Sequence, residues 1–341
     1  MSIGLVGASF EKVSLQFLER IYLNRNQTQT FLKIFPKDVV TEVAVVSTCN
    51  RVEFYFVSDD FYKGYSCVLA AISDFLSISS VDLTHHMEVK RDQDVVEHLF
   101  RVASGVKSMV FGECEILGQV KQAYEISYQY QGTGPQLNKM IQTAISVGKR
   151  VRDETKIGQG MSSISSVAID MLQSQCADFS TKPVLVIGTG IMGQRTIKRL
   201  VDSGHPNITV TNRTDKKAQM LAQKFAVKFL PYSTVFASLS SFGAVIVAIN
   251  DTKNVLLSSH FKRLVDPCFV IDMGVPRNVD PMVANHKDIT LLTLDDFREV
   301  THQTKAARQN EIVTVDAIIK EEMADLERWQ TYRETCHSMS V

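Results

Sequence analysis

Apolar residues fall into short runs along this chain, and two runs near the N-terminus predict a pair of strands. EVAVVS (42–47) and VEFYFV (52–57) are rich in β-branched and aromatic residues, which are typical of strands. The polar residues 48–51 separate them and predict a turn. This turn places a thiol, an amide and a guanidinium next to one another.

The middle of the chain has the pattern of a doubly wound parallel sheet. Its strands are nearly apolar, as expected of strands buried on both faces; they are VLVI (184–187), ITVTN (208–212), AVIVAI (244–249) and CFVIDMGVP (268–276). A Gly-x-Gly-x-x-Gly motif lies between the first strand and a helical pattern, which predicts a loop that binds a dinucleotide pyrophosphate at a helix N-terminus. The cofactor-binding candidates there are Gly188, Thr189, Gly190, Ile191, Met192 and Gly193.

The end of the second strand discriminates between NAD and NADP. NAD sites usually have an acidic residue there for the ribose 2′-hydroxyl, whereas NADP sites have cations for the 2′-phosphate. This chain has Asn212, Arg213 and Thr214, followed by Lys216 and Lys217. Because no acid is present and an arginine can grip a phosphate, we expect NADPH as the cofactor.

Helical patterns also occur before and after this central region of the chain. DVVEHLFRVASG (94–105) has an apolar face with His98 beside it. From about residue 295 onward glycine and proline are absent, and the chain is predicted to be helical. Ile312, Ile319 and Leu326 share one heptad position, and Val315, Glu322 and Trp329 share the other. This is a short apolar seam with one polar break.

Length and composition fit a globular protein of about two domains. The chain has 341 residues, of which 45% are hydrophobic and 22% are charged. Its 37 basic and 37 acidic residues balance, so no global field attracts a polyanion. We expect domains at 1–155 and 156–292 and a C-terminal helix over 293–341. The fold class is thus α/β: an α+β domain, a central doubly wound Rossmann-type NADP domain and a long helix.

The cysteines predict a reducing compartment rather than a metal site. They are single and scattered, at positions 49, 67, 114, 176, 268 and 336, without metal-ligand spacing. No signal peptide and no membrane-length apolar run is evident, so we expect a cytoplasmic protein without a metal. A lone cysteine after a strand is usually a packing residue. Cys49 differs because it lies in a polar turn, where Arg51 would lower its pKa and favour a nucleophilic thiolate.

Several motifs occur together in an order that is specific. They are STCNRVE, HLFRVASGVKSMVFGE, ILGQVKQAYE, VLVIGTGIMG, NRT and IDMGVPRNVDP. In these motifs the chain resembles the glutamyl-tRNA reductase family from Ile3 to about Trp329. The STCNR and GVKSMVFGE–ILGQ stretches carry the resemblance, whereas the glycine motif occurs in many families.

The resemblance implies a reaction that explains the turn. Cys49 would attack the ester between glutamate and tRNA, and NADPH would reduce the resulting thioester to glutamate-1-semialdehyde, the first step of five-carbon tetrapyrrole (porphyrin) biosynthesis. Arg51 would grip the substrate γ-carboxylate, Glu113 would face its ammonium, and His98 would act as a general acid or base. The implied substrate-binding residues are Thr48, Asn50, Arg51, Ser108, Glu113, Cys114, Glu115 and Gln119.

The chain departs from the family pattern in three places, and rival functions remain open. Glu113-Cys114-Glu115 replaces Glu-Pro-Gln, GTGIMG replaces GAGEMG, and the chain stops soon after Trp329. The short end leads us to expect a weak homodimer, and the family implies glutamate-1-semialdehyde aminomutase as a partner. One alternative is a shikimate dehydrogenase-like NADP oxidoreductase. The other is a non-catalytic nucleotide-binding regulatory protein.

Basic clusters offer candidate tRNA contacts without distinguishing among them. Lys149, Arg150 and Arg152 form one cluster, and Lys262 and Arg263 form another. Charge runs of this kind are usually solvated surface, so the sequence does not assign the tRNA surface to either cluster.

Overall fold

The computed structural model describes residues 1–157, 163–249, 254–261, 264, 266–297 and 309–338. The chain forms two compact units: unit 1 is Met1–Met161 with Thr304–Val341, and unit 2 is Ser162–Gln303. Unit 2 is therefore inserted into the sequence of unit 1. The C-terminal helix, which was expected as a segment separate from both domains, belongs to unit 1.

Unit 1 is built on a four-stranded sheet in the order β2-β3-β1-β4. Each paired strand is antiparallel to its neighbour. The strands are β1 (Ser2–Ser9), β2 (Val40–Ser47), β3 (Arg51–Ser58) and β4 (Glu88–Arg91). The two runs predicted as strands from the sequence are thus the hairpin β2–β3, with Ser47 opposite Val52 and the predicted turn between them.

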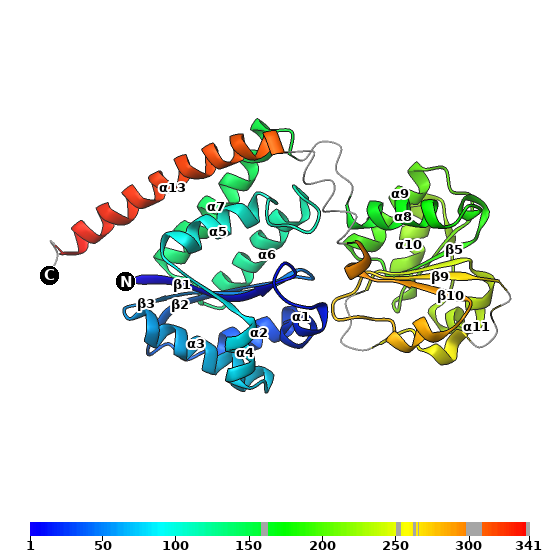
Figure 1. Ribbon diagram of the computed structural model, residues 1–341, viewed down its shortest axis with the longest axis horizontal. Helices are drawn as coiled ribbons and strands as arrows, with labels where there is room; N and C mark the ends of the chain where they lie inside the picture. Colours follow the sequence, from blue (N-terminus) through cyan, green and yellow to red (C-terminus); the bar gives the residue numbers. More distant parts are fainter. Residues whose placement is uncertain (158–162, 250–253, 262–263, 265, 298–308, 339–341) are drawn as a thin grey trace. The chain divides into compact units, whose positions relative to one another are not determined.

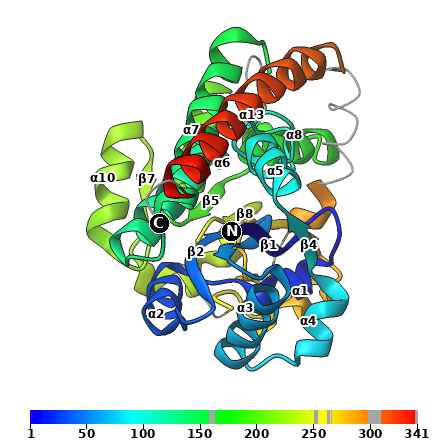
Figure 2. The same ribbon diagram turned by 90° about the vertical axis from the view of Figure 1, so that its left-hand side faces the viewer.

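Helices cover both faces of this sheet. Figures 1 and 2 show α5, α6 and α7 on one face and α1 to α4 on the other. The helices are α1 (Leu15–Ile21), α2 (Arg25–Ile34), α3 (Phe61–Leu76), α4 (Ser80–His86), α5 (Gln93–Ala103), α6 (Glu115–Gln129) and α7 (Pro135–Glu154). Tyr55 and Val57 of β3 and Leu99 of α5 belong to one continuous core between the sheet and α5–α7. Burial of this apolar surface holds α5 against β3.

The apolar seam of α13 (Gln309–Ser338) packs within unit 1. Val315, Ile319 and Leu326 are buried in the same core, and Trp329 packs partly against it. Charged contacts flank the seam: Arg101 of α5 binds Asp316 at 2.9 Å, and Arg150 of α7 binds Glu321 and Glu322 at 2.8 and 3.0 Å. The backbone N–H of Lys156 donates to the Glu311 carboxylate at 2.8 Å, so the chain segment after α7 and the start of α13 meet.

Unit 2 is a parallel sheet in the order β10-β9-β8-β5-β6-β7. The strands are β5 (Val184–Ile187), β6 (Ile208–Thr211), β7 (Lys228–Phe229), β8 (Ala244–Val247), β9 (Cys268–Asp272) and β10 (Ile289–Leu292). The helices are α8 (Ile164–Gln175), α9 (Ile191–Asp202), α10 (Asp215–Phe225) and α11 (Val235–Ser238), with short 3₁₀ turns between them. The strand order reverses between β5 and β8, which is where such sheets bind ligands.

Within the described residues, no single helix has the length and apolar character to cross a bilayer. Only the bent pair α3 and α4, with 115° between its members, meets that test on length and composition when both helices are taken together.

Candidate active site

The β2–β3 turn is held by its own hydrogen bonds. The Thr48 N–H donates to the Arg51 carbonyl at 2.8 Å, and the Thr48 hydroxyl oxygen accepts from the N–H groups of Asn50 and Arg51, each at 3.2 Å. The Phe10 N–H donates to the Asn50 carbonyl at 2.9 Å and ties the turn to the end of β1. Thr48, expected from the resemblance to bind substrate, therefore shapes the turn, and Cys49 lies at its tip, half-buried.

Alternate residues of β3 form a buried charged network behind the turn. Arg51, Glu53 and Tyr55 share one face of the strand, because side chains alternate along a strand. The Glu53 carboxylate accepts from Arg51 Nη1 at 2.8 Å and from the Tyr55 hydroxyl at 2.6 Å. His98 Nε2 of α5 lies 2.8 Å from the same carboxylate. Since a carboxylate can only accept, Nε2 carries a proton in this contact.

The network fixes the charges of its members. Although burial alone would raise the pKa of Glu53, the charge of Arg51 and the contacts of His98 hold it well below 4.5. Burial, together with the Glu53 charge, raises the pKa of Tyr55 well above 10. Arg51 is 1% exposed. Its guanidinium is engaged by the Glu53 carboxylate and by the Lys107 carbonyl.

The pKa of Cys49 moves opposite to the prediction. Burial and the charge of Glu113 raise it from 9.0 to about 12, and they outweigh the lowering by Arg51. Arg51 lowers the pKa of the thiol as predicted, but the net shift is upward because burial, the largest cause, and Glu113 act against it. Because the charge of Glu113 raises the pKa of the thiol, the Glu113 carboxylate lies near Cys49.

A loop between α5 and α6 forms the other side of the site. Its 104–114 segment carries Ser108 and Glu113, both buried. Arg51 Nη2 donates to the Lys107 carbonyl of this loop, so the loop contacts the network directly. The Gly105 carbonyl accepts from the Gly112 N–H at 2.8 Å and closes the loop on itself.

Four of the predicted site residues in the turn, α5 and the loop bury a polar atom that has no hydrogen-bond partner among the described residues. These atoms are Asn50 Oδ1, Arg51 Nε, His98 Nδ1 and Ser108 Oγ. They come from the turn and from α5 with the loop that follows it, two segments far apart in the sequence. Buried polar groups are normally paired, so this concentration fits a site that receives a polar ligand.

The remaining predicted residues of unit 1 are less closely joined to this network. Cys114 is exposed, Glu115 begins α6, and Gln119 lies partly buried one turn later. Of the basic candidates for tRNA contact, Arg150 is taken up by Glu154, Glu321 and Glu322. Arg152 faces inward to backbone carbonyls. Lys262 and Arg263 lie outside the described residues.

The glycine motif of unit 2 has the geometry that its spacing predicts. Gly188 has φ +118°, and a Cβ on it would lie 2.3 Å from the Ala248 carbonyl oxygen of the neighbouring strand end. A Cβ on Gly193 would lie 2.1 Å from the Gly188 oxygen, so α9 packs directly on the loop. A Cβ on Gly190, in contrast, would meet no atom of the described residues within 4 Å. This open space next to the α9 N-terminus suits a pyrophosphate.

The residues after β6 are consistent with a phosphate-bearing cofactor. Asn212 donates through Nδ2 to the Thr214 carbonyl at 3.2 Å, and Arg213 is exposed.

In the glycine loop, the Thr189 carbonyl accepts from Gln194 Nε2 at 3.0 Å, which fixes the loop. Ile191, at 68% exposure, is a large apolar residue presented to solvent at the start of α9. The described residues contain no cluster that could hold a metal ion.

Sequence reasoning missed Glu53, although it joins most of the network. The signal was available, because an acid in the apolar run VEFYFV lies two residues from Arg51 and so on the same strand face.

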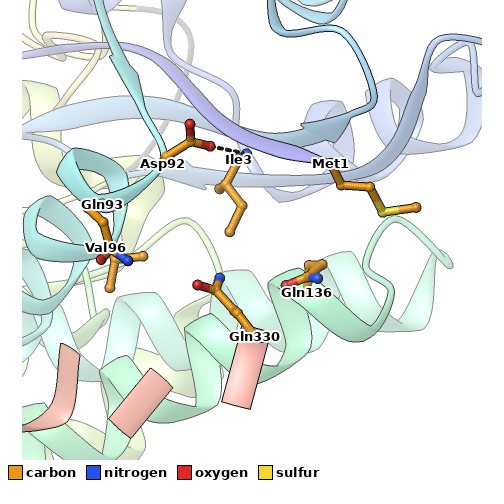
Figure 3. Close-up of a pocket in the computed structure, with 7 residues that line it drawn as sticks. All are labelled: Met1, Ile3, Asp92, Gln93, Val96, Gln136 and Gln330. Atoms are coloured by element: carbon orange, nitrogen blue, oxygen red, sulfur yellow. Dashed lines mark hydrogen bonds between the residues drawn. The ribbon is translucent and has the colours of Figure 1, made fainter. Parts of the chain in front are cut away.

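Unit 1 also has a separate pocket, with a volume of about 180 Å³, whose lining residues are drawn in Figure 3. It is lined by Met1, Ile3, Asp92, Gln93, Val96, Gln136 and Gln330, none of which was predicted as a site residue.

Comparison with known proteins agrees with this division of the chain. Residues 6–155 match the family model of the glutamyl-tRNA(Glu) reductase N-terminal domain, and residues 170–300 match that of shikimate / quinate 5-dehydrogenase. The second match identifies unit 2 as a dehydrogenase-type domain suited to a nicotinamide nucleotide.

Full-length relatives extend the match to both units. Glutamyl-tRNA reductase of Halalkalibacterium halodurans is 31% identical over 96% of this chain and 73% of its own. That of Acaryochloris marina is 32% identical over 100% of this chain and 80% of its own. The solved structure of the enzyme from Methanopyrus kandleri is 30% identical, covers 96% of this chain and 80% of that one, and has a TM-score of 0.51. The chain therefore belongs to the glutamyl-tRNA reductase family.

Proposed function

We propose that this protein reduces the glutamate of glutamyl-tRNA(Glu) to glutamate-1-semialdehyde through a thioester on Cys49, with NADPH as the reductant. The observation that carries the proposal is the group of unpartnered buried polar atoms in the turn that holds Cys49, in α5 and in the loop that follows α5. A non-catalytic nucleotide-binding protein has no use for such a group. A shikimate dehydrogenase-like enzyme has no use for a cysteine among these polar residues.

The substrate matches this group in its charges. An aminoacyl ester carries its ammonium on the carbon next to the carbonyl that a nucleophile attacks. Glu113, whose charge reaches the Cys49 thiol, is therefore placed to bind that ammonium. The Ser108 hydroxyl and the Asn50 amide oxygen remain to bond the polar atoms around it.

Binding would also prepare the nucleophile. The resting thiol, with a pKa of about 12, is almost entirely protonated near neutral pH. An ammonium paired with Glu113 cancels one cause of this high pKa, so the thiolate forms best when substrate is present. The Sγ then attacks the ester carbonyl, the C–O bond to the tRNA ribose breaks, and the ribose oxygen takes up a proton.

His98 is placed to support proton transfer, since Nε2 is held by Glu53 and Nδ1 has no partner among the described residues. Arg51 would serve the substrate γ-carboxylate only if it exchanged its contact with Glu53 for one with the substrate. The glycine loop and Arg213 are the parts of the chain that would hold NADPH, which would supply the hydride for reduction of the thioester.

The experiment that tests this proposal separates acylation from reduction. The protein is incubated with glutamyl-tRNA carrying ¹⁴C-glutamate, with and without NADPH. Wild type should retain acid-stable label without NADPH and release labelled aldehyde with it. Cys49→Ser should do neither while binding NADPH as wild type does, because serine is far harder to ionise. Retention of label by Cys49→Ser would contradict the thioester, and reduction of shikimate instead would support the dehydrogenase alternative.

Three finer expectations stay proposals. A cytoplasmic location is supported by the described cysteines 49, 67, 114, 176 and 268, all of which are free. Direct transfer of the reactive aldehyde to an aminomutase rests on the family. A weak homodimer needs an interface other than the buried α13 seam; exposed Val313 and Tyr332 lie on that helix, and sedimentation across protein concentrations measures the association.

A further inference from the structure

Arg152, near the end of α7, joins the two ends of the loop that carries Ser108 and Glu113. Its Nη1 donates to the Ala103 carbonyl at 3.0 Å and also to the Gly148 carbonyl, and its Nη2 donates to the Glu113 carbonyl at 2.9 Å. Ala103 is the last residue of α5, and Glu113 comes just before α6. One guanidinium therefore closes the loop at its base, where its positive charge also favours the carbonyl end of α5.

The segment that follows α7 contacts the same loop a second time. Gly112 has φ +80°, and a Cβ on it would lie 2.4 Å from the carbonyl oxygen of Ile157. On the network side, Arg51 donates to the Lys107 carbonyl. The loop is thus contacted at three places: Arg152 binds both of its ends, Ile157 packs against Gly112, and Arg51 binds the Lys107 carbonyl.

We propose that Arg152 is a positioning residue for substrate recognition, because it holds the loop in the shape that buries Ser108 and Glu113 beside Cys49. It acts through backbone carbonyls and does not touch the substrate. This inference rests on the proposed function. It also replaces a phosphate-binding role for Arg152, since its contacts direct it into the protein. A lysine has a single ammonium and cannot span carbonyls at both ends of the loop.

The test compares Arg152→Met with Lys63→Met, which removes an exposed cation of α3 and has the same charge change. Amide hydrogen exchange reports on the loop, and single-turnover acylation by glutamyl-tRNA reports on recognition. In Arg152→Met the Ser108 and Gly112 amides should exchange at least about 10-fold faster, and KM should rise about 10- to 100-fold, the range for one lost charged hydrogen bond. Lys63→Met should match wild type in both measurements, and NADPH affinity should not change in either variant.

Arg152→Lys should fall between wild type and Arg152→Met, and it decides the matter if the methionine variant does not fold. Unchanged amide hydrogen exchange in the loop would overturn the proposal that Arg152 holds the loop in shape. Faster exchange with unchanged KM and kcat would overturn the role in recognition. If wild type forms no thioester, the proposed function fails and the role in recognition fails with it, whereas the exchange data still report whether Arg152 holds the loop.

Discussion

Glu113 is expected to have opposite effects on the intrinsic reactivity of Cys49 and on its reaction with substrate. Its charge helps to raise the thiol pKa to about 12, so at pH 8 only about one molecule in 10⁴ carries a thiolate. In general, two unit charges about 6 Å apart at an effective dielectric constant of about 20 interact by about 3 kcal/mol, or about 100-fold in ionisation. Because burial is the larger cause of the high pKa, this figure is an upper limit, and Glu113→Gln should speed alkylation of Cys49 by roughly 10- to 100-fold.

The same substitution should nearly abolish acylation by glutamyl-tRNA, since a neutral amide does not hold an ammonium as a carboxylate does. Iodoacetamide labelling followed by peptide mass spectrometry measures the first effect, with Cys67 of α3 as the internal reference. Glu125→Gln, an exposed acid on α6, controls for net charge. Unchanged labelling would refute the electrostatic coupling of Glu113 to the thiol, and normal acylation would refute its role as the ammonium partner.

Further predictions concern the charged network and the cofactor. Arg51→Lys should lower Tm and thioester formation together, because one ammonium cannot serve both Glu53 and the Lys107 carbonyl; wild-type values for both would contradict this. Glu53→Gln should cost about 3 kcal/mol in urea unfolding at pH 7, since it leaves Arg51 buried without its partner. Because the Glu53 pKa is depressed in the folded state, its contribution is present above about pH 4.5 and should fade as the pH drops below that value; a pH-independent difference would argue against it. Asn212→Asp with Arg213→Ala should weaken NADPH binding and shift preference towards NADH in fluorescence titration, whereas an unchanged preference would mean that the 2′-phosphate is held elsewhere.

Local patterns were sufficient to predict the elements but not their partners. The strand, glycine loop and helix of unit 2 follow one another in the sequence, so the packing roles of Gly188 and Gly193 could be predicted from their spacing alone. The hairpin around Cys49 was predictable for the same reason. In both places the interacting residues are near neighbours in the chain.

The charged network was not predictable in this way because its members are distant in sequence. His98 meets Glu53 across 45 positions, and Arg51 meets the Lys107 carbonyl across 56. Sequence proximity assigned Arg51 to Cys49, whereas in the fold its nearest charge is Glu53. The sequence left the role of Arg152 open for a related reason: its neighbours Lys149 and Arg150 gave it the pattern of a basic surface, whereas its own contacts lie at Ala103 and Glu113.

The insertion of unit 2 between α7 and α13 also sets the order in which a nascent chain can complete unit 1. The core positions that Val315, Ile319 and Leu326 fill on α5 and α7 stay uncovered until the whole of unit 2 has been translated. Unit 2 is roughly 140 residues long, and synthesis at about 5–20 residues per second takes roughly 7 to 30 s to cross it. For that interval an incomplete unit 1 presents an apolar groove at the ribosome. We expect chaperones that recognise exposed apolar surface to engage the growing chain there and to leave once α13 has docked.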